Sequence, residues 1–362
     1  MIPLRRLLRS TVLLLALGLP PVIAADTPAK PVVKPDGNIS TPGFSLPYSG
    51  YASAEARALF PRMLEQGSHA PSLAIALATS IEPSRAFYGK INADRAQRME
   101  QLYPVKIHAE TIGGIATDVV LPAQGVAKAQ QRRVLINLHG GAFLWGAHSG
   151  GLVESIPLAS LGRIKVISVD YRQGPEHTFP AASEDVEAVY RALLKQYPAK
   201  NIGIYGCSAG GFLTGEAVAR FISRKLPVPG AIGMFCGAVS ELNGDSAYIA
   251  PVLNGEAAPT AVMPLSSLPY FKGANASDPL VFPSKSPALL AKFPPSLLIT
   301  GTRDFTMSSV LQSQRLLTAA GVDTELHVWD GMWHSFFSDP EMPESKEAYA
   351  VMVHFFDRHL GR

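Results

Sequence analysis

From about residue 104 onward, short apolar runs alternate along the chain with segments of helical periodicity. Continuous runs of Val, Ile and Leu are typical of strands that are buried on both faces. Their alternation with helices predicts an α/β protein, with a mostly parallel central sheet flanked by helices. The predicted strands are Val134–Leu138, Val166–Val169, Ile202–Tyr205, Ala231–Phe235, Leu297–Ile299 and Leu326–Trp329.

Two regions depart from this alternation. Residues 44–100 are apolar without strand-like alternation, and they contain helix-like stretches at Ala54–Leu64 and Leu73–Ala78. Residues 241–293 are rich in proline, which is typical of loops. We expect the two regions to pack together as a helical cap within one domain that spans residues 44–362. Plain core packing is the alternative explanation for their bulky side chains.

The N-terminus has the order of features of a bacterial secretory signal peptide. Three arginines precede an apolar run at Thr11–Leu19, which prolines end and small residues follow. We predict a signal peptide at residues 1–24, with cleavage near Ala24 or Ala25, and a flexible lead-in at residues 25–43. The mature protein is then expected to be periplasmic or secreted. An uncleaved anchor is the alternative, although the apolar run is short for a bilayer span.

Charge and cysteine content narrow the function classes. The chain has 32 Lys and Arg residues against 29 Asp and Glu residues, and residues 1–24 hold three of the arginines and no acidic residue. The mature chain is therefore close to neutral, which gives no electrostatic reason to expect nucleic acid or an anionic membrane as a partner. No stable membrane insertion is expected after signal cleavage. Cys207 and Cys236 are too few for a typical zinc site. We expect two buried free thiols, with a disulfide as the alternative.

The strongest chemical signal is the segment Gly206-Cys207-Ser208-Ala209-Gly210. It is a G-x-S-x-G sequence between a predicted strand and an amphipathic helix, which is the context of a nucleophile elbow. The tight turn needs small residues on both sides of the serine, and the following helix N-terminus favours negative charge near Ser208. A glycine-rich turn with an incidental serine is the alternative for the pentapeptide alone.

A second glycine-rich segment follows the predicted strand Val134–Leu138. It reads His139-Gly140-Gly141-Ala142. Glycines at this place allow backbone N–H groups to approach a substrate oxygen closely. The segment is a candidate oxyanion loop, and a plain strand-to-loop turn is the alternative.

An acid and a histidine follow the last two predicted strands. Asp304 comes after Leu297–Ile299, and His334 comes after Leu326–Trp329. Taken alone, the aspartate would be a helix cap or turn residue, and the histidine a core or surface residue. The chain order of Ser208, Asp304 and His334 is the order of an α/β-hydrolase triad, and all three follow strands of one predicted sheet.

These motifs resemble the hormone-sensitive-lipase-like branch of the α/β hydrolases, the bacterial family IV esterases. His139–Phe143 is similar to the HGGG-F/W segment of that branch, Asp170–Ala182 to its D-Y-R-x-x-P-E-x-x-F-P-A stretch, and Asp278-Pro279 to its DP segment. The resemblance covers about residues 104–360. Ala142 departs from it, because the branch has a third glycine there. Its N–H survives, and its methyl group is expected to narrow the pocket or shift the loop.

The resemblance implies an α/β-hydrolase fold and a carboxylesterase that needs no cofactor or metal. Ser208 attacks an ester carbonyl in this mechanism, His334 takes up its proton, and Asp304 orients the imidazole. A small-molecule ester with a short-to-medium acyl chain is expected, with lactones and aryl esters left open. The implied oxyanion donors are the N–H groups of Gly141, Ala142 and Ala209. The supporting residues are His139, Gly140, Gly206 and Gly210.

Two other functions stay open at this point. A serine peptidase or amidase of the same fold would use the same triad, although the Asp170–Ala182 segment favours esterases. A non-catalytic binding protein of this fold is less favoured, because Ser208, Asp304 and His334 are all in place. A homodimer is also left open.

Overall fold

The computed structural model describes residues 31–41, 43 and 45–361, and it divides into two units, Met1–Pro47 and Tyr48–Arg362. The predicted signal peptide at residues 1–24 lies outside the described residues. In the predicted lead-in at residues 25–43, β1 (Val32–Val33) and β2 (Ile39–Ser40) form an exposed antiparallel hairpin. In the described part of the chain, no helix combines the length and the apolar character that a bilayer span requires.

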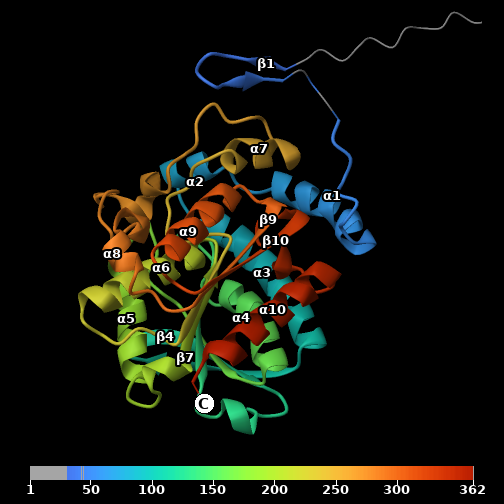
Figure 1. Cartoon of the computed structure of the whole chain (residues 1–362). Coiled ribbons are helices and arrows are strands. Elements are labelled where there is room, and N and C mark those ends of the chain that lie inside the picture. The colour runs from blue at the N-terminus through green and yellow to red at the C-terminus, as the bar shows by residue number, and fades with distance from the viewer. Residues whose placement is uncertain (1–30, 42, 44, 362) are drawn as a thin grey trace, which may run out of the picture. The chain divides into compact units, whose positions relative to one another are not determined.

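The second unit is built on an eight-stranded sheet in the order β10-β9-β8-β7-β5-β6-β4-β3 (Figure 1). The six predicted strands are all present and pair in parallel. They are β5 (Val134–Leu138), β6 (Lys165–Val169), β7 (Ile202–Cys207), β8 (Ala231–Phe235), β9 (Ser296–Arg303) and β10 (Thr324–Trp333).

An antiparallel hairpin at one edge of the sheet was not among the predicted strands. It consists of β3 (Val105–Ile112) and β4 (Ile115–Pro122), and β4 pairs antiparallel with β6. Most side chains of β3 are exposed or half-buried, and Lys106, His108 and Glu110 interrupt its apolar residues. An edge strand needs no continuous apolar run, because its sides are open to water.

Helices cover both faces of the sheet. Figure 1 shows α4 and α10 on one side of the strands and α5 and α6 on the other. Neighbouring strand residues belong to different core clusters: Ile136 packs with the α5 and α6 side, and Leu135 with the α4 and α10 side. Both faces are therefore buried, as the continuous apolar runs predict. The helices are α1 (Ala54–Ser68), α2 (Leu73–Ala78), α3 (Glu82–Leu102), α4 (Ser149–Gly162), α5 (Ala181–Leu193), α6 (Ala209–Ser223), α7 (Ser246–Leu253), α8 (Pro287–Leu290), α9 (Met307–Ala319) and α10 (Pro343–His359).

The two regions predicted as a cap both meet the end of β9. The guanidinium of Arg303 lies 4.4 Å from the ring centroid of Tyr48 and 4.8 Å from that of Phe60, while its carbonyl accepts a hydrogen bond from the Asn254 amide at 3.1 Å. Part of the second region is core rather than covering, because Tyr270 and Phe271 are buried in the cluster on the α5 and α6 side. The influence of these regions on substrate size stays a prediction.

Candidate active site

Ser208, Asp304 and His334 each stand directly after a parallel strand. Ser208 follows β7, Asp304 follows β9, and His334 follows β10. The carboxyl ends of parallel strands meet at one edge of a sheet, so the fold brings residues up to 126 positions apart to the same place. The fold brings the three predicted residues together there, with His334 in contact with both of the others.

The contacts among the three residues form a chain of hydrogen bonds. His334 Nε2 lies 2.8 Å from Ser208 Oγ, and His334 Nδ1 lies 2.7 Å from Asp304 Oδ1. Asp304 is fully buried, which opposes its ionisation, but His334 and the N–H and hydroxyl of Thr306 lower the pKa of Asp304 below its ordinary value. The arrangement can hold an imidazole with its free nitrogen directed at the serine hydroxyl.

The nucleophile turn holds Ser208 in a strained conformation, with φ 56° and ψ −121°. The turn is this tight because a Cβ atom on Gly206 or on Gly210 would overlap the carbonyl oxygen of Leu138. The Ser208 N–H donates to the Phe235 carbonyl at 2.7 Å, which ties the turn to the neighbouring strand. Strain of this kind persists only where the surrounding structure imposes it.

The predicted oxyanion loop follows β5 with positive φ angles at three successive residues, 119° at Gly141, 53° at Ala142 and 58° at Phe143. A Cβ atom on Gly141 would overlap the carbonyl oxygen of Trp145, so the loop accepts only glycine there. Ala142 takes the left-handed conformation despite its methyl group, and it lines the cavity beside Ser208. Among the described residues, the three implied oxyanion donors have no hydrogen-bond acceptor: they are the N–H groups of Gly141, Ala142 and Ala209.

His139 and the Asp170–Ala182 segment hold this loop in place through stacking and hydrogen bonds. The buried His139 ring stacks on Tyr171 at a centroid distance of 4.3 Å, and its Nδ1–H donates to the Gly140 carbonyl at 2.8 Å. The Tyr171 hydroxyl donates to the His139 carbonyl at 2.7 Å, and the Gly174 N–H donates to the Phe143 carbonyl at 2.8 Å. Burial lowers the pKa of His139, so it acts here as a neutral ring.

Glu154 is a site residue that the sequence did not reveal. This α4 side chain accepts hydrogen bonds from the Gly140 N–H at 2.9 Å, the Asn137 amide at 2.9 Å and the Cys207 N–H at 3.2 Å. It thereby joins the oxyanion loop to the nucleophile turn. Burial raises the pKa of Glu154 to about 8, and the three donors oppose the rise. Its only signal in the sequence is a lone acid within an apolar helix.

The side chains that could bind a metal ion already make hydrogen bonds within the protein. Cys207 and Cys236 are free and buried, and Cys207 Sγ lies 2.8 Å from the Ser335 hydroxyl. Within the part of the chain that the structure describes, two groups place potential metal-ligand atoms within 4.8 Å of one another. In the first, Asp304 and His334 already contact each other, as described above. In the second, His148 Nδ1 lies 2.6 Å from an Asp118 oxygen, and the His148 N–H donates to Asp170. The groups are Cys236 with Asp304 and His334, and Asp118 with His148 and Asp170.

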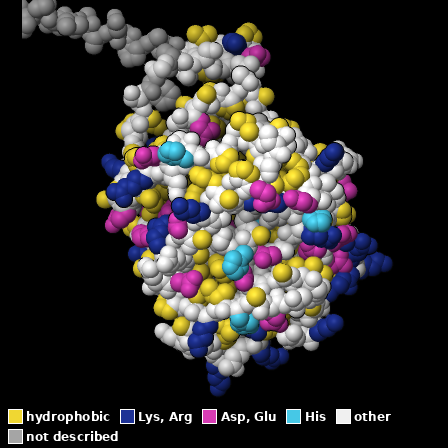
Figure 2. All heavy atoms as spheres, turned by 180° about the vertical axis from the view of Figure 1, so that it is seen from behind, with side chains coloured by type: hydrophobic (Ala, Val, Ile, Leu, Met, Phe, Trp, Pro, Cys, Tyr) yellow, Lys and Arg dark blue, Asp and Glu magenta, His cyan; other side chains and the backbone are white. Residues whose placement is uncertain are grey.

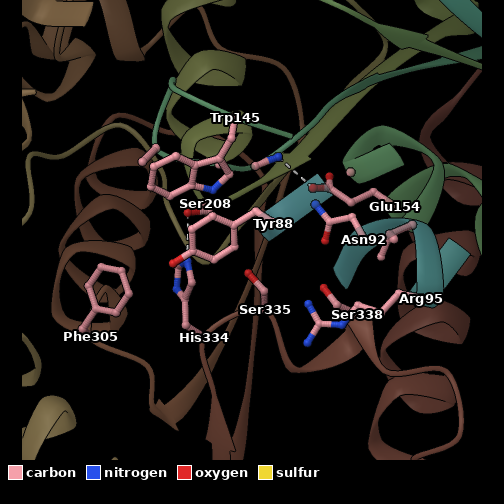
Figure 3. A pocket seen from close by; sticks show the side chains of 15 residues that line it. Tyr88, Asn92, Arg95, Trp145, Glu154, Ser208, Phe305, His334, Ser335 and Ser338 are labelled. Atoms are coloured by element: carbon pink, nitrogen blue, oxygen red, sulfur yellow. Dashed lines mark hydrogen bonds between the residues drawn. The ribbon is translucent and has the colours of Figure 1, made fainter. Parts of the chain in front are cut away.

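A cavity of about 400 Å³ opens in front of Ser208 and His334. Figure 3 shows two different sides of this cavity. The aromatic side chains of Tyr88, Trp145 and Phe305 gather on one side, and the Tyr88 and Trp145 rings stack at a centroid distance of 4.5 Å. The polar side chains lie on the other side: Asn92, Arg95, Glu154 and Ser338.

Known proteins share this sequence pattern and fold. A family model described as alpha/beta hydrolase fold matches residues 135–338. An acetyl-hydrolase of Streptomyces hygroscopicus is 27% identical over 78% of this chain and 91% of its own, and an esterase of Acinetobacter venetianus is 26% identical over 63% and 76%. The crystal structure of an esterase matches with a TM-score of 0.77 at 28% identity, covering 89% of this chain and 99% of that one. An esterase of the bacterial hormone-sensitive lipase family matches with a TM-score of 0.73 at 25% identity, covering 85% and 99%.

Proposed function

The chain belongs to the α/β-hydrolase-fold family and is a carboxylic ester hydrolase similar to the hormone-sensitive-lipase-family esterases, and on this premise we propose that it works through an acyl-enzyme on Ser208. The observation that carries the proposal is the chain of hydrogen bonds from Asp304 through His334 to Ser208, at 2.7 and 2.8 Å. It ends beside backbone N–H groups that have no acceptor in the described residues.

The first half-reaction forms the acyl-enzyme. Ser208 Oγ attacks the ester carbonyl carbon as His334 Nε2 takes up the hydroxyl proton. The carbonyl oxygen becomes an oxyanion, which the loop and the start of α6 stabilise through the N–H groups of Gly141, Ala142 and Ala209. The C–O bond then breaks, and the alcohol leaves with the proton from His334.

The second half-reaction regenerates the serine. A water molecule attacks the acyl carbon, and His334 takes up the proton of the water. The carboxylic acid leaves as the proton returns to Ser208 Oγ. Throughout, Asp304 accepts the Nδ1–H of the imidazole and stabilises the imidazolium, because its lowered pKa keeps it ionised.

We further propose that the acyl group is short to medium in length. The cavity of about 400 Å³ must hold both arms of the ester, and drug-sized ligands occupy pockets of roughly 300–1,000 Å³. The name of one relative, acetyl-hydrolase, is in keeping with a small acyl group.

The test is a p-nitrophenyl ester series from acetate to palmitate, measured on the wild-type protein and on Ser208→Ala. We expect turnover of short or medium esters and a loss of about 10⁴-fold or more in kcat for the variant. A fluorophosphonate label should attach to the wild-type protein and not to the variant. A variant with wild-type activity would contradict the proposed nucleophile. Cleavage of aminoacyl-anilides in place of esters would favour the amidase alternative.

A further inference from the structure

One helix, α3, contributes side chains to both sides of the cavity. Tyr88, Asn92 and Arg95 line the cavity from the same face of α3, at a spacing of four and then three residues. Figure 3 shows the Asn92 amide and the Arg95 guanidinium on the side that also holds Ser338, away from the Trp145 and Phe305 rings. The triad chemistry proposed above uses none of these polar groups.

Within the described part of the chain, Arg95 makes only one long contact with a carboxylate. Its one hydrogen bond in the described residues reaches the Asp339 carboxylate at 3.4 Å. Asp339 is shared with Arg98, which approaches it at 3.2 Å and has a second partner, Glu341, at 2.8 Å. A guanidinium has five N–H donors, so most of those on Arg95 are available to a ligand. Its side chain is 20% exposed.

The neighbours of Arg95 in the cavity add further donors. Within the residues that the structure describes, the Asn92 amide and the Ser338 hydroxyl make no side-chain hydrogen bond, although both line the cavity. The one carboxyl group of this wall, Glu154, is occupied by the three donors described above. Burial raises its pKa to about 8, which limits its negative charge near neutral pH. The wall therefore presents mainly hydrogen-bond donors, among them the Arg95 guanidinium.

We propose that this wall is a subsite for a carboxylate, and that the preferred substrates are small carboxylic esters bearing a carboxylate on one arm. The proposal rests on the esterase function proposed above. The planar fork of Arg95 matches the two oxygens of a carboxylate, and Asn92 and Ser338 supply further donors. The other arm of the ester then lies against the rings of Tyr88, Trp145 and Phe305.

A structural role for Arg95 is the competing explanation. An arginine that only tied α3 to Asp339 would be expected to make a short, two-pronged contact. The observed contact is single and long, and the same carboxylate serves Arg98 at a shorter distance. Arg95 also lines a second hollow on the outer side, together with Arg62 and Arg98, so its guanidinium lies between solvent and the catalytic cavity.

The test compares acid and amide members of two matched ester pairs. The first pair, 4-acetoxybutanoate and 4-acetoxybutanamide, carries the group on the alcohol arm. The second pair, monoethyl glutarate and ethyl glutaramate, carries it on the acyl arm. We expect the acid to exceed its amide in kcat/KM by about 10-fold or more in at least one pair, since hydrogen bonds to charged groups are the stronger ones. Added salt should reduce this ratio.

The variant Arg95→Gln should reduce the acid-to-amide ratio by about 10-fold. Arg62→Gln is the matched control, because it removes the same charge from the outer hollow and does not line the catalytic cavity. Its ratio should stay at the wild-type value.

Three results would overturn the proposed subsite: a ratio near one in both pairs, a ratio that Arg95→Gln leaves unchanged, or an equal fall in Arg62→Gln. If the subsite proposal fails, hydrolysis of the ester bond in the amide-bearing compounds, lost in Ser208→Ala, would show that the esterase function still stands. If neither member of either pair nor any p-nitrophenyl ester is hydrolysed, the proposed function itself fails.

Discussion

The two walls of the catalytic cavity are built in different ways. The wall at the strand ends holds its groups on strained backbone, with φ 56° at Ser208 and 119° at Gly141. The α3 wall presents Tyr88, Asn92 and Arg95 from a continuous helix of 21 residues, with no residue of positive φ. The chemical step needs backbone N–H groups and a hydroxyl at set positions, and only unusual backbone conformations supply these. Recognition of a substrate arm needs only side chains on one helix face.

The two walls are also expected to differ in how well they tolerate substitutions. Figure 2 shows acidic and basic side chains interspersed over one face of the molecule, as in an ordinary solvated surface. The α3 wall carries the charge of Arg95 on a continuous helix and is expected to tolerate substitution, with changes in selectivity. The strand-end wall is close-packed, and small changes there are expected to cost activity.

Among the substitutions that compare the two walls, the largest effect is expected for Gly141→Ala. The new methyl group would overlap the Trp145 carbonyl, and alanine disfavours a φ of 119°. The oxyanion loop must shift, so kcat/KM should fall by about 10²–10³-fold, the cost of losing one oxyanion donor. Steady-state kinetics on a short p-nitrophenyl ester, with circular dichroism to verify folding, would measure it.

Gly89→Ala is the matched control on the α3 wall. A Cβ atom on Gly89 meets no atom within 4 Å, and the residue lies in the interior of a helix. We expect kcat/KM to stay within about twofold and the free energy of unfolding to rise by about 0.5–1 kcal/mol. Equal activity losses in the two variants would remove the distinction between the walls.

An intermediate effect is expected for Glu154→Gln. Glutamine keeps one acceptor oxygen, whereas Glu154 uses both oxygens to hold Gly140, Asn137 and Cys207. The oxyanion loop and the nucleophile turn lose part of their connection, so kcat should fall by about 10–100-fold with little change in KM. A rise in KM at constant kcat would instead indicate that Glu154 contacts the substrate in its ground state.

The smallest effect is expected on the free energy of unfolding, for a substitution at Glu216. Glu216 of α6 is fully buried, and neither of its carboxylate oxygens has a partner among the described residues. Burial raises the pKa of Glu216 well above its ordinary value. The resulting cost is absent below pH 4.5, the ordinary value, and it grows as the pH rises toward the pKa of the folded state. Glu216→Met should therefore raise the free energy of unfolding at pH 8 by about 1–2 kcal/mol, and by less at pH 4.5.

The control for Glu216 is a buried glutamate that has partners. Glu187 of α5 accepts hydrogen bonds from Arg191 at 2.7 Å and from Arg220 at 2.5 Å. Glu187→Met should lower the free energy of unfolding, because the buried Arg220 loses its main partner. Urea unfolding at pH 4.5 and pH 8 compares the two variants. A lower free energy of unfolding for Glu216→Met than for the wild-type protein at pH 8 would contradict the conclusion that the unpartnered Glu216 carboxyl destabilises the fold.

The order of strands and helices followed from the sequence, except at one edge. Val134–Leu138 and Ala231–Phe235 are strands with the predicted bounds, because a strand buried on both faces must be apolar throughout. The β3–β4 hairpin escaped prediction because its outer strand mixes Lys106, His108 and Glu110 with apolar residues. At a sheet edge, water can hydrogen-bond to polar side chains that a buried strand could not accommodate.

The sequence by itself determined the residues of the strand-end wall. Ser208, Asp304 and His334 each follow a buried strand, so their convergence at one edge is a consequence of parallel pairing. Only the tertiary structure decided what faces them. Asn92 and Arg95 reach the cavity because α3 packs closely on α4, where Gly150 leaves room for the Asn92 amide. Glu154 acquires its partners on the other side of α4, where this helix packs on the end of β5 and the nucleophile turn. A polar helix face has no local signal for such a role, because its neighbours are set by contacts distant in the chain.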